Sequence, residues 1–134
     1  MTVDKYIPSG LYGFVTDGRR RLFFHLKDFD PGTYTGESPV PPVSGEEVEV
    51  EVRGDDKSAS KVQRLEEPSE MNGAVDWFDT VKGYGFILGL DGSTYYLHRS
   101  EVLDGRLPLP GRRVRFYTSS KRRACFVKVE DGHG

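Results

Sequence analysis

Aromatic side chains recur at alternate positions in two short segments of this sequence, 82–87 (Lys-Gly-Tyr-Gly-Phe-Ile) and 94–98 (Thr-Tyr-Tyr-Leu-His). As strands, these segments have a period of two, so Tyr84 and Phe86 share one face, and Tyr96 lies on the outward face of the next strand. The opposite faces already carry residues for a core, so the outward rings need another explanation. Stacking on nucleotide bases supplies one, because every base presents a π-face to an aromatic ring.

The wider segment 73–98 resembles the cold-shock domain, a small OB-type barrel that binds single-stranded nucleic acid. In that family a Gly-x-Val-x-Trp-Phe strand leads into Lys-Gly-(Phe or Tyr)-Gly-Phe-Ile, and a turn then leads into Val-Phe-Val-His. The matching segments here are 73–78, 82–87 and 95–98, in the same order and spacing. The resemblance implies a binding face made of stacking rings and a lysine near the nucleic-acid backbone: Trp77, Lys82, Tyr84, Phe86, Tyr96 and His98.

A second, looser copy of the pattern lies nearer the N-terminus. Segment 10–15 lines up with 82–87, and segment 22–25 lines up with 95–98. The equivalent phenylalanines are 72 residues apart and the equivalent histidines 73, so the copies differ by one residue of turn length. The repeat predicts two domains of the same kind in tandem.

The expected fold class is therefore all-β, with two tandem five-stranded OB-type (cold-shock) barrels joined by a short linker. Residues 1–66 are expected to form a divergent, acidic barrel, and residues 71–130 a typical barrel with intact nucleic-acid-binding motifs. The polar, proline-broken stretch 66–70 is the expected linker. Residues 1–70 hold 9 Lys and Arg against 14 Asp and Glu, whereas residues 71–134 hold 10 against 7. The basic half is thus also the half with the intact motifs, as nucleic-acid binding requires.

The first copy departs from the family pattern at positions that matter for binding. Lys5 stands where the second copy has Trp77, and Gly10 stands where it has Lys82. After the motif histidine, where the family often has a further aromatic, the second copy has Arg99, expected to stack by its guanidinium plane or to meet a phosphate. The first copy has Leu26 there, which can do neither. Four binding-face residues remain in the first copy: Tyr12, Phe14, Phe23 and His25. Weaker binding, or binding of something else, is expected of this barrel.

Three other segments of the first half carry expectations. The proline-rich connection 27–44 cannot be a central strand and acts either as a tolerated surface insertion or as a lid or partner contact. Segment 46–52 alternates Glu and Val, so its valines are expected inward and its glutamates in solvent. Its expected partner is 59–65, across a turn at 54–56. The corresponding strand of the second half, 112–117, has arginine where the first has glutamate.

Two short features have more than one interpretation. The arginine run 19–21 lies at the turn between the motif strands of the first copy, where it either meets phosphates or protects a solvated edge. Gly83 and Gly85 resemble a phosphate-cradling loop, but no helix follows them as a dinucleotide-binding fold would need. Close approach of a base or barrel curvature explains these glycines better.

No metal site, catalytic site or cofactor is expected. His25 and His98 occupy equivalent places in different barrels, His133 lies near the C-terminus, and Cys125 is the single cysteine. Neither zinc-ligand spacing nor a Ser/His/Asp grouping results, so the protein is expected not to be an enzyme. No apolar run approaches the roughly 18 residues of a membrane span, so no membrane partner is expected. The lone cysteine excludes an internal disulfide and is compatible with the cytoplasm, which is the expected location.

The leading hypothesis is a protein that binds single-stranded RNA or ssDNA, chiefly through its second barrel. As the resemblance implies, it would work as a nucleic-acid chaperone or as a regulator of transcription or translation. The alternative is a protein-interaction module in which the acidic first barrel docks a protein partner. A combination of the two is also consistent with the sequence. Stacking does not separate RNA from DNA, because it is indifferent to the 2′-hydroxyl.

Overall fold

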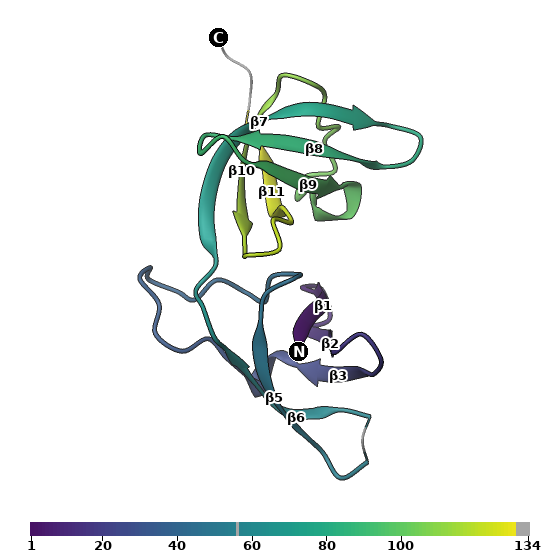
Figure 1. Ribbon diagram of the computed structural model, residues 1–134, viewed down its shortest axis with the longest axis vertical. Coiled ribbons are helices and arrows are strands. Elements are labelled where there is room, and N and C mark those ends of the chain that lie inside the picture. Colours follow the sequence, from purple (N-terminus) through teal and green to yellow (C-terminus); the bar gives the residue numbers. More distant parts are fainter. Residues whose placement is uncertain (56, 131–134) are drawn as a thin grey trace. The chain divides into compact units, whose positions relative to one another are not determined.

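The computed structural model describes residues 1–55 and 57–130, and it is built from β-strands with two short 3-10 helices. The chain divides into two compact units, unit 1 (Met1–Pro68) and unit 2 (Ser69–Gly134), which follow each other in the colours of Figure 1. Among the described residues there is no helix with the length and apolar character needed to span a bilayer.

Unit 2 contains one five-stranded antiparallel sheet in the order β11-β10-β7-β8-β9 (Figure 1). Its elements are β7 (Ser69–Asp79), β8 (Tyr84–Gly89), β9 (Thr94–His98), the 3-10 helix η2 (Arg99–Glu101), β10 (Arg113–Thr118) and β11 (Cys125–Val129). A parallel bridge joins Tyr96 of β9 to Arg123, just before β11. The Tyr96 N–H donates to the Arg122 carbonyl at 2.9 Å, and the Ala124 N–H donates to the Tyr96 carbonyl at 2.8 Å. The two end strands are thereby connected, and the sheet closes on itself.

The alternation expected for β8 and β9 explains which side chains fill this closed sheet. Ile87 and Leu97 are fully buried and Tyr95 is almost so, while Tyr84 and Phe86 face the other way. A Cβ on Gly85 would lie 2.1 Å from the Trp77 carbonyl oxygen, so only glycine lets β8 approach β7 here. This close backbone approach supports barrel curvature as the reason for Gly85.

Unit 1 has the same order of strands. Its elements are β1 (Thr2–Ile7), β2 (Tyr12–Thr16), β3 (Arg21–His25), η1 (Leu26–Asp28), β4 (Phe29–Asp30), β5 (Val48–Val52) and β6 (Ala59–Arg64). They form two sheets, β1-β2-β3 and β4-β6-β5. Isolated bridges join these sheets at Thr2↔Glu47 and at Phe23↔Ser58, the second of them parallel like the closing bridge of unit 2. The all-β, OB-type fold class is confirmed.

The two units also share their register at the motif strands. In unit 2 a bulge separates Val75 from Trp77, which pairs with Phe86. In unit 1 the same bulge precedes Lys5, which pairs with Phe14. Lys5 therefore occupies in unit 1 the position that Trp77 occupies in unit 2.

The prediction that residues 66–70 form a linker is wrong for its last two residues, Ser69 and Glu70. Ser69 pairs with Thr118, and Glu70 pairs with Tyr117, so both residues belong to β7 rather than to a connection. The polar character of these residues reflects the exposed end of the strand, because both residues are exposed to solvent. Polarity alone therefore misplaced the start of the second unit's first strand.

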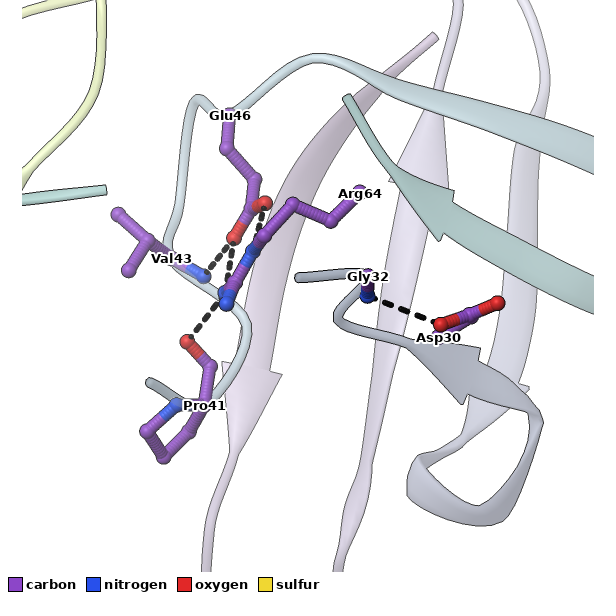
Figure 2. A network of polar contacts seen from close by, with 6 residues as sticks. All are labelled: Asp30, Gly32, Pro41, Val43, Glu46 and Arg64. Carbon is purple, nitrogen blue, oxygen red and sulfur yellow. Dashed lines mark hydrogen bonds and ion pairs between the residues drawn. The ribbon is translucent and has the colours of Figure 1, made fainter. Parts of the chain in front are cut away.

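The expected placement of Glu46 in solvent is also wrong, because this side chain is almost completely buried. Glu46 precedes β5, and Figure 2 shows its carboxylate meeting the guanidinium of Arg64. Arg64 Nε lies 2.7 Å from Glu46 Oε1, and Arg64 Nη2 donates to Glu46 Oε2 at 2.9 Å and to the Pro41 carbonyl at 2.9 Å. The Val43 N–H donates to Glu46 Oε2 at 2.7 Å. A charge is thus tolerated in the interior because it is paired and hydrogen-bonded.

Val52 departs from the expected inward placement of the valines. It is 36% exposed and follows a register shift between Glu51 and Val52 in the pairing of β5 with β6. The expected turn at 54–56 begins after this point: the Asp55 carboxylate accepts the Lys57 N–H at 3.0 Å. Asp56 lies outside the described residues.

The proline-rich connection contains only the two-residue β4 as regular strand, in keeping with the expectation that it forms no central strand. Near its start the Gly32 N–H donates to Asp30 Oδ1 at 2.9 Å (Figure 2). Near its end Val43 is fully buried, and the Pro41 carbonyl accepts from Arg64. The pairing of β4 with β6 ties the start of the loop to the rest of unit 1, and the hydrogen bond from Arg64 ties its end. Its role as a lid or partner contact stays a prediction.

Candidate nucleic-acid interface

Four aromatic rings form a continuous cluster on the outer face of unit 2, here called the unit 2 platform: Trp77, Tyr84, Phe86 and Tyr96. The Trp77 ring lies 5.4 Å, centroid to centroid, from both Tyr84 and Phe86. Tyr84 and Tyr96 are stacked at 6.2 Å with an interplanar angle of 23°. Phe86 meets Tyr96 edge-on at 5.9 Å. Strands β7, β8 and β9 position these rings, because each contributes outward residues at its registered positions.

The unit 2 platform leaves substantial ring area open. Trp77 is 40% exposed and Tyr96 is 37% exposed, values that are high for large aromatic side chains on a folded sheet. Tyr84 and Phe86 are half-buried between them. An exposed group of rings with no core function offers flat apolar faces that match the face of a base.

The turn from β7 to β8 carries Lys82 to one end of the platform. Asp79 Oδ1 accepts hydrogen bonds from the backbone N–H of Lys82 and of Val81, both at 2.9 Å. These backbone hydrogen bonds, with help from the Lys82 charge, hold the pKa of the Asp79 carboxyl below its usual value. Gly83 completes the turn with φ = +79°, a conformation that glycine adopts without strain.

His98 has a structural role that the sequence did not reveal. Its Nδ1 accepts a hydrogen bond from the Ser100 N–H at 3.1 Å and lies 2.8 Å from Ser100 Oγ, so the ring caps the 3-10 helix η2. Because Nδ1 acts as an acceptor for the amide, the neutral ring carries its hydrogen on Nε2. The exposed imidazole can then present Nε2–H to a ligand.

Arg99 lies against the turn that carries Lys82. Its Nη2 donates to the Thr80 carbonyl, and its backbone N–H donates to the Gly83 carbonyl at 2.8 Å. A Cβ built on Gly83 would lie 3.7 Å from Arg99 Nε, so the side chain runs over this glycine. Arg99 therefore supports the β7–β8 turn. The two roles expected from the sequence, stacking by the guanidinium plane and contact with a phosphate, stay predictions.

Unit 1 repeats this arrangement with three rings, here called the unit 1 platform: Tyr12, Phe14 and Phe23. Tyr12 and Phe23 are stacked at 5.5 Å with an interplanar angle of 29°, and Phe14 lies 6.0 Å from each of them. His25 accepts the Lys27 N–H on Nδ1 at 3.2 Å and caps η1, as His98 caps η2. All four binding-face residues expected in the first copy thus share one face.

The unit 1 platform differs because an arginine covers one of its rings. The Arg21 guanidinium carbon lies 4.0 Å from the centroid of the Phe14 ring, and Arg21 Nε lies 2.9 Å from the Asp4 carboxylate. Arg21 is the first residue of β3 rather than a turn residue, so it shares a face with Phe23 two positions later. Alternation in the sequence places Arg21 and Phe23 on one face, but the pairing of β2 with β3 is what brings the guanidinium over Phe14.

In the described part of unit 2, Thr94 rather than a cation holds the place of Arg21. Arg21 of β3 pairs with Thr16 of β2 in unit 1. The corresponding pair in unit 2 is Thr94 of β9 with Leu88 of β8, so Thr94 corresponds to Arg21. The other arginines of the run serve the turn: the N–H groups of Arg19 and Arg20 both donate to Asp17 Oδ1 at 2.8 Å.

Within the described residues, no group of three or more His, Cys, Asp or Glu side chains is arranged to hold a metal ion. Cys125 is buried and is not part of a disulfide. His133 lies outside the described residues.

These features first define a class: an all-β OB-type protein with exposed aromatic clusters on the outer face of its motif strands. The sequence is 44% identical over 54 residues to Cold shock protein 1 of Lactiplantibacillus plantarum, a match that covers 39% of this chain and 82% of that protein. The chain belongs to the cold-shock protein family, a nucleic-acid-binding family without enzymatic activity.

Other comparisons cover less. Cold shock protein 2 of the same organism is 48% identical over 31 residues, which is 23% of this chain and 47% of that protein. The solved structure drosophila Unr CSD456 aligns with a TM-score of 0.39 and 19% identity, covering 98% of this chain. The alignment spans 62% of that longer chain, less than two thirds of its length. No family model matches the sequence.

Proposed function

We propose that this protein binds single-stranded RNA or ssDNA through the unit 2 platform, with Lys82, His98 and Arg99 at its margin. In this proposal each unit is one cold-shock barrel, and the protein acts in the cytoplasm as a nucleic-acid chaperone or a regulator of transcription or translation. The observation that carries the proposal is the four-ring cluster, in which Trp77 and Tyr96 are open to solvent.

The magnitude of stacking limits what the rings do alone. Stacking contributes ~1–3 kcal/mol per base, so three or four stacks at the low end give about 3–4 kcal/mol in total. A micromolar Kd corresponds to about 8 kcal/mol, so phosphate contacts must add to the stacking energy. The positive net charge of residues 71–134 favours such contacts.

Trp77 gives a direct test, because it is the protein's only tryptophan and belongs to the platform. Oligo-dT and oligo-U are titrated into the full chain at two salt concentrations, and the tryptophan fluorescence is followed. Quenching that weakens with salt is expected, with a slope near −0.7 per phosphate neutralised. Unchanged fluorescence with both strands at low salt would refute the proposal, and the ratio of dT to U affinity would separate DNA from RNA.

A second role is proposed for unit 1, the docking of a protein partner. Its platform lacks a tryptophan, Lys5 takes that place, and Arg21 covers Phe14. Residues 1–70 also carry a net charge of −5, which repels phosphates. Both observations make unit 1 a poor match for nucleic acid and a better match for a basic protein segment.

A further inference from the structure

The outward face of β8 continues beyond the rings of the unit 2 platform. Tyr84, Phe86 and Leu88 alternate along this strand, so Leu88 shares their face and lies about 7 Å along the strand from Phe86. Leu88 is 52% exposed, and Leu90, in the turn that follows, is more exposed still. The Leu90 N–H donates to the Asn72 carbonyl at 2.9 Å, which holds this turn beside β7. An apolar surface therefore adjoins the rings.

A groove of about 580 Å³ lies along this surface, a volume within the range of pockets that hold small ligands. Three side chains of its lining are here called the leucine shelf: Ala74, Leu88 and Leu90. Arg113 lines the groove from β10. Glu130 also contributes to the lining, and its carboxylate lies 3.6 Å from Arg115 Nη2. The groove thus combines apolar side chains with an arginine, while its acidic residue is paired with a second arginine.

Strand pairing places the shelf in a row that crosses four strands. Arg113 of β10 is opposite Ala74 of β7, Ala74 is opposite Leu88, and Leu88 is opposite Thr94 of β9. Directly opposite side chains of antiparallel strands lie on one face, so these four side chains form a continuous row. The platform rings of β7, β8 and β9 form the next row along the same strands.

The same row has a different chemistry in unit 1. Its residues are, in the same order, Glu47, Thr2, Thr16 and Arg21. Threonines take the places of the apolar pair, and an acid takes the place of Arg113. In unit 2, by contrast, an apolar centre ends in a cation. A nucleotide needs this combination, because its base presents a flat face for apolar contact and its phosphate is an anion.

We propose that the leucine shelf is a further nucleotide subsite of unit 2, in which a base lies against Leu88 and Leu90 and a phosphate meets Arg113. This inference rests on the proposed binding of single-stranded nucleic acid, and it extends the path of the strand past Phe86. Apolar side chains can hold the faces of bases, as they do around flipped bases. Continuity with the rings and the cation at the end of the row favour a nucleotide over an apolar protein surface, which would need no anion site.

The dependence of affinity on strand length tests the subsite in the full chain. Oligo-dT strands of about 4 to about 10 nucleotides, lengths typical of OB-fold sites, are titrated by fluorescence anisotropy. Leu88→Thr, which installs the residue that unit 1 has at this place, should weaken binding by about fivefold, the low end for one base contact. The loss should appear only once the strand is long enough to reach beyond the rings. Leu103→Thr is the matched control, because Leu103 is similarly exposed, at 57%, and lies outside the groove lining.

The salt dependence tests the phosphate contact separately. Arg113→Ala should lower the magnitude of the salt slope by about 0.7 for the long strands, the value for one phosphate on a single strand. Lys128→Ala removes the same charge from β11, on the far side of β10 from β7, and should change the slope by less. Equal changes in the two variants would overturn the contact between Arg113 and a phosphate.

The outcomes separate this inference from the proposed function. If Leu88→Thr binds strands of every length as tightly as the unaltered chain, while the strands still quench Trp77, the subsite is overturned and the platform stands. Binding of no strand by the unaltered chain would overturn both. If the leucines instead join two copies of the chain, sedimentation would show a dimer that Leu88→Thr converts to a monomer with unchanged oligonucleotide affinity, and the subsite is again overturned. Because Leu88 is exposed, its substitution leaves the core intact.

Discussion

Units 1 and 2 share one strand order and one register, yet they differ in what lies over their outward rings. In unit 2 four rings form the platform, and Thr94 stands in the place that Arg21 has in unit 1. In unit 1 the same framework carries three rings, and Arg21 lies over Phe14 while it pairs with Asp4. The comparison teaches that the barrel positions the rings, but single outward residues decide whether a base can reach them.

The units differ in their interiors as well. Arg64 pairs with Val48 in unit 1, and Val129 pairs with the equivalent Val114 in unit 2. A buried Arg–Glu pair therefore occupies in one unit a position that a valine fills in the other. This pair also holds the end of the proline-rich loop through the Pro41 carbonyl.

The largest expected effect comes from breaking that pair. Arg64→Met leaves the Glu46 carboxylate buried without its counter-charge, which costs about 3–5 kcal/mol of unit 1 stability. Hydrogen exchange of the β5 and β6 amides measures the loss, and the amides of β10 and β11 serve as an internal reference. The exposed pair of Arg53 with Asp28 is the matched control, because Arg53→Met should cost less than about 1 kcal/mol.

The double variant Glu46→Met/Arg64→Met sharpens the same comparison. Replacing a buried ion pair by apolar residues of similar volume is often neutral or stabilising by about 1–4 kcal/mol, so most of the lost stability should return. If the double variant is as unstable as Arg64→Met alone, the hydrogen bonds to Val43 and Pro41, rather than the uncompensated charge, dominate the site.

The next effect concerns binding by the two platforms. Phe86→Ala or Tyr96→Ala should each weaken oligonucleotide binding by about 1–3 kcal/mol, because each removes one stacking surface. The equivalent unit 1 changes, Phe14→Ala and Phe23→Ala, should change the affinity by less. Fluorescence anisotropy of a labelled oligonucleotide measures both sets. Equal losses in the two units would contradict the dominance of unit 2.

A smaller effect is expected from converting unit 1 toward unit 2. Lys5→Trp supplies the missing ring, and Arg21→Thr uncovers Phe14 with the residue that unit 2 has at that place. In a Phe86→Ala background, the two changes together should restore about 1 kcal/mol of the binding free energy for the oligonucleotide, which is the low end for one stacked base. Arg20→Thr is the control, since Arg20 belongs to the Asp17 turn. No gain would show that the acidity of unit 1, rather than its covered ring, prevents binding.

The smallest effect is a pH dependence confined to the β7–β8 turn. The folded-state pKa of Asp79 is lowered by backbone N–H donors, so its stabilising contribution is present above its unfolded pKa of about 3.9 and is lost as the pH falls through the folded value. The protection factors of the Val81 and Lys82 amides, which correct for the intrinsic pH dependence of exchange, should therefore fall below about pH 4. The unit 1 turn has Ile7 in the place of Asp79, so the Gly10 amide is a built-in control. Asp79→Ala should abolish the difference between the turns.

Much of the architecture followed from local patterns. The period of two in β8 and β9 predicted which rings face outward, and the repeat predicted Lys5 in the place of Trp77, as the shared bulges then showed. Alternation failed at Glu46, because this residue precedes the strand and finds a buried partner 18 positions away. It also failed at Val52, where the pairing of β5 with β6 shifts register.

The sequence by itself determined the fold class and the outward aromatic positions, since both depend on alternation and turn residues within a few positions of one another. Only the tertiary structure decided which rings are covered and which charges are buried. The contact of Arg21 with Phe14 depends on the pairing of β3 with β2, and the Arg64–Glu46 pair joins side chains that are 18 positions apart. Such contacts are fixed by register across the closed sheet, which local sequence patterns do not specify.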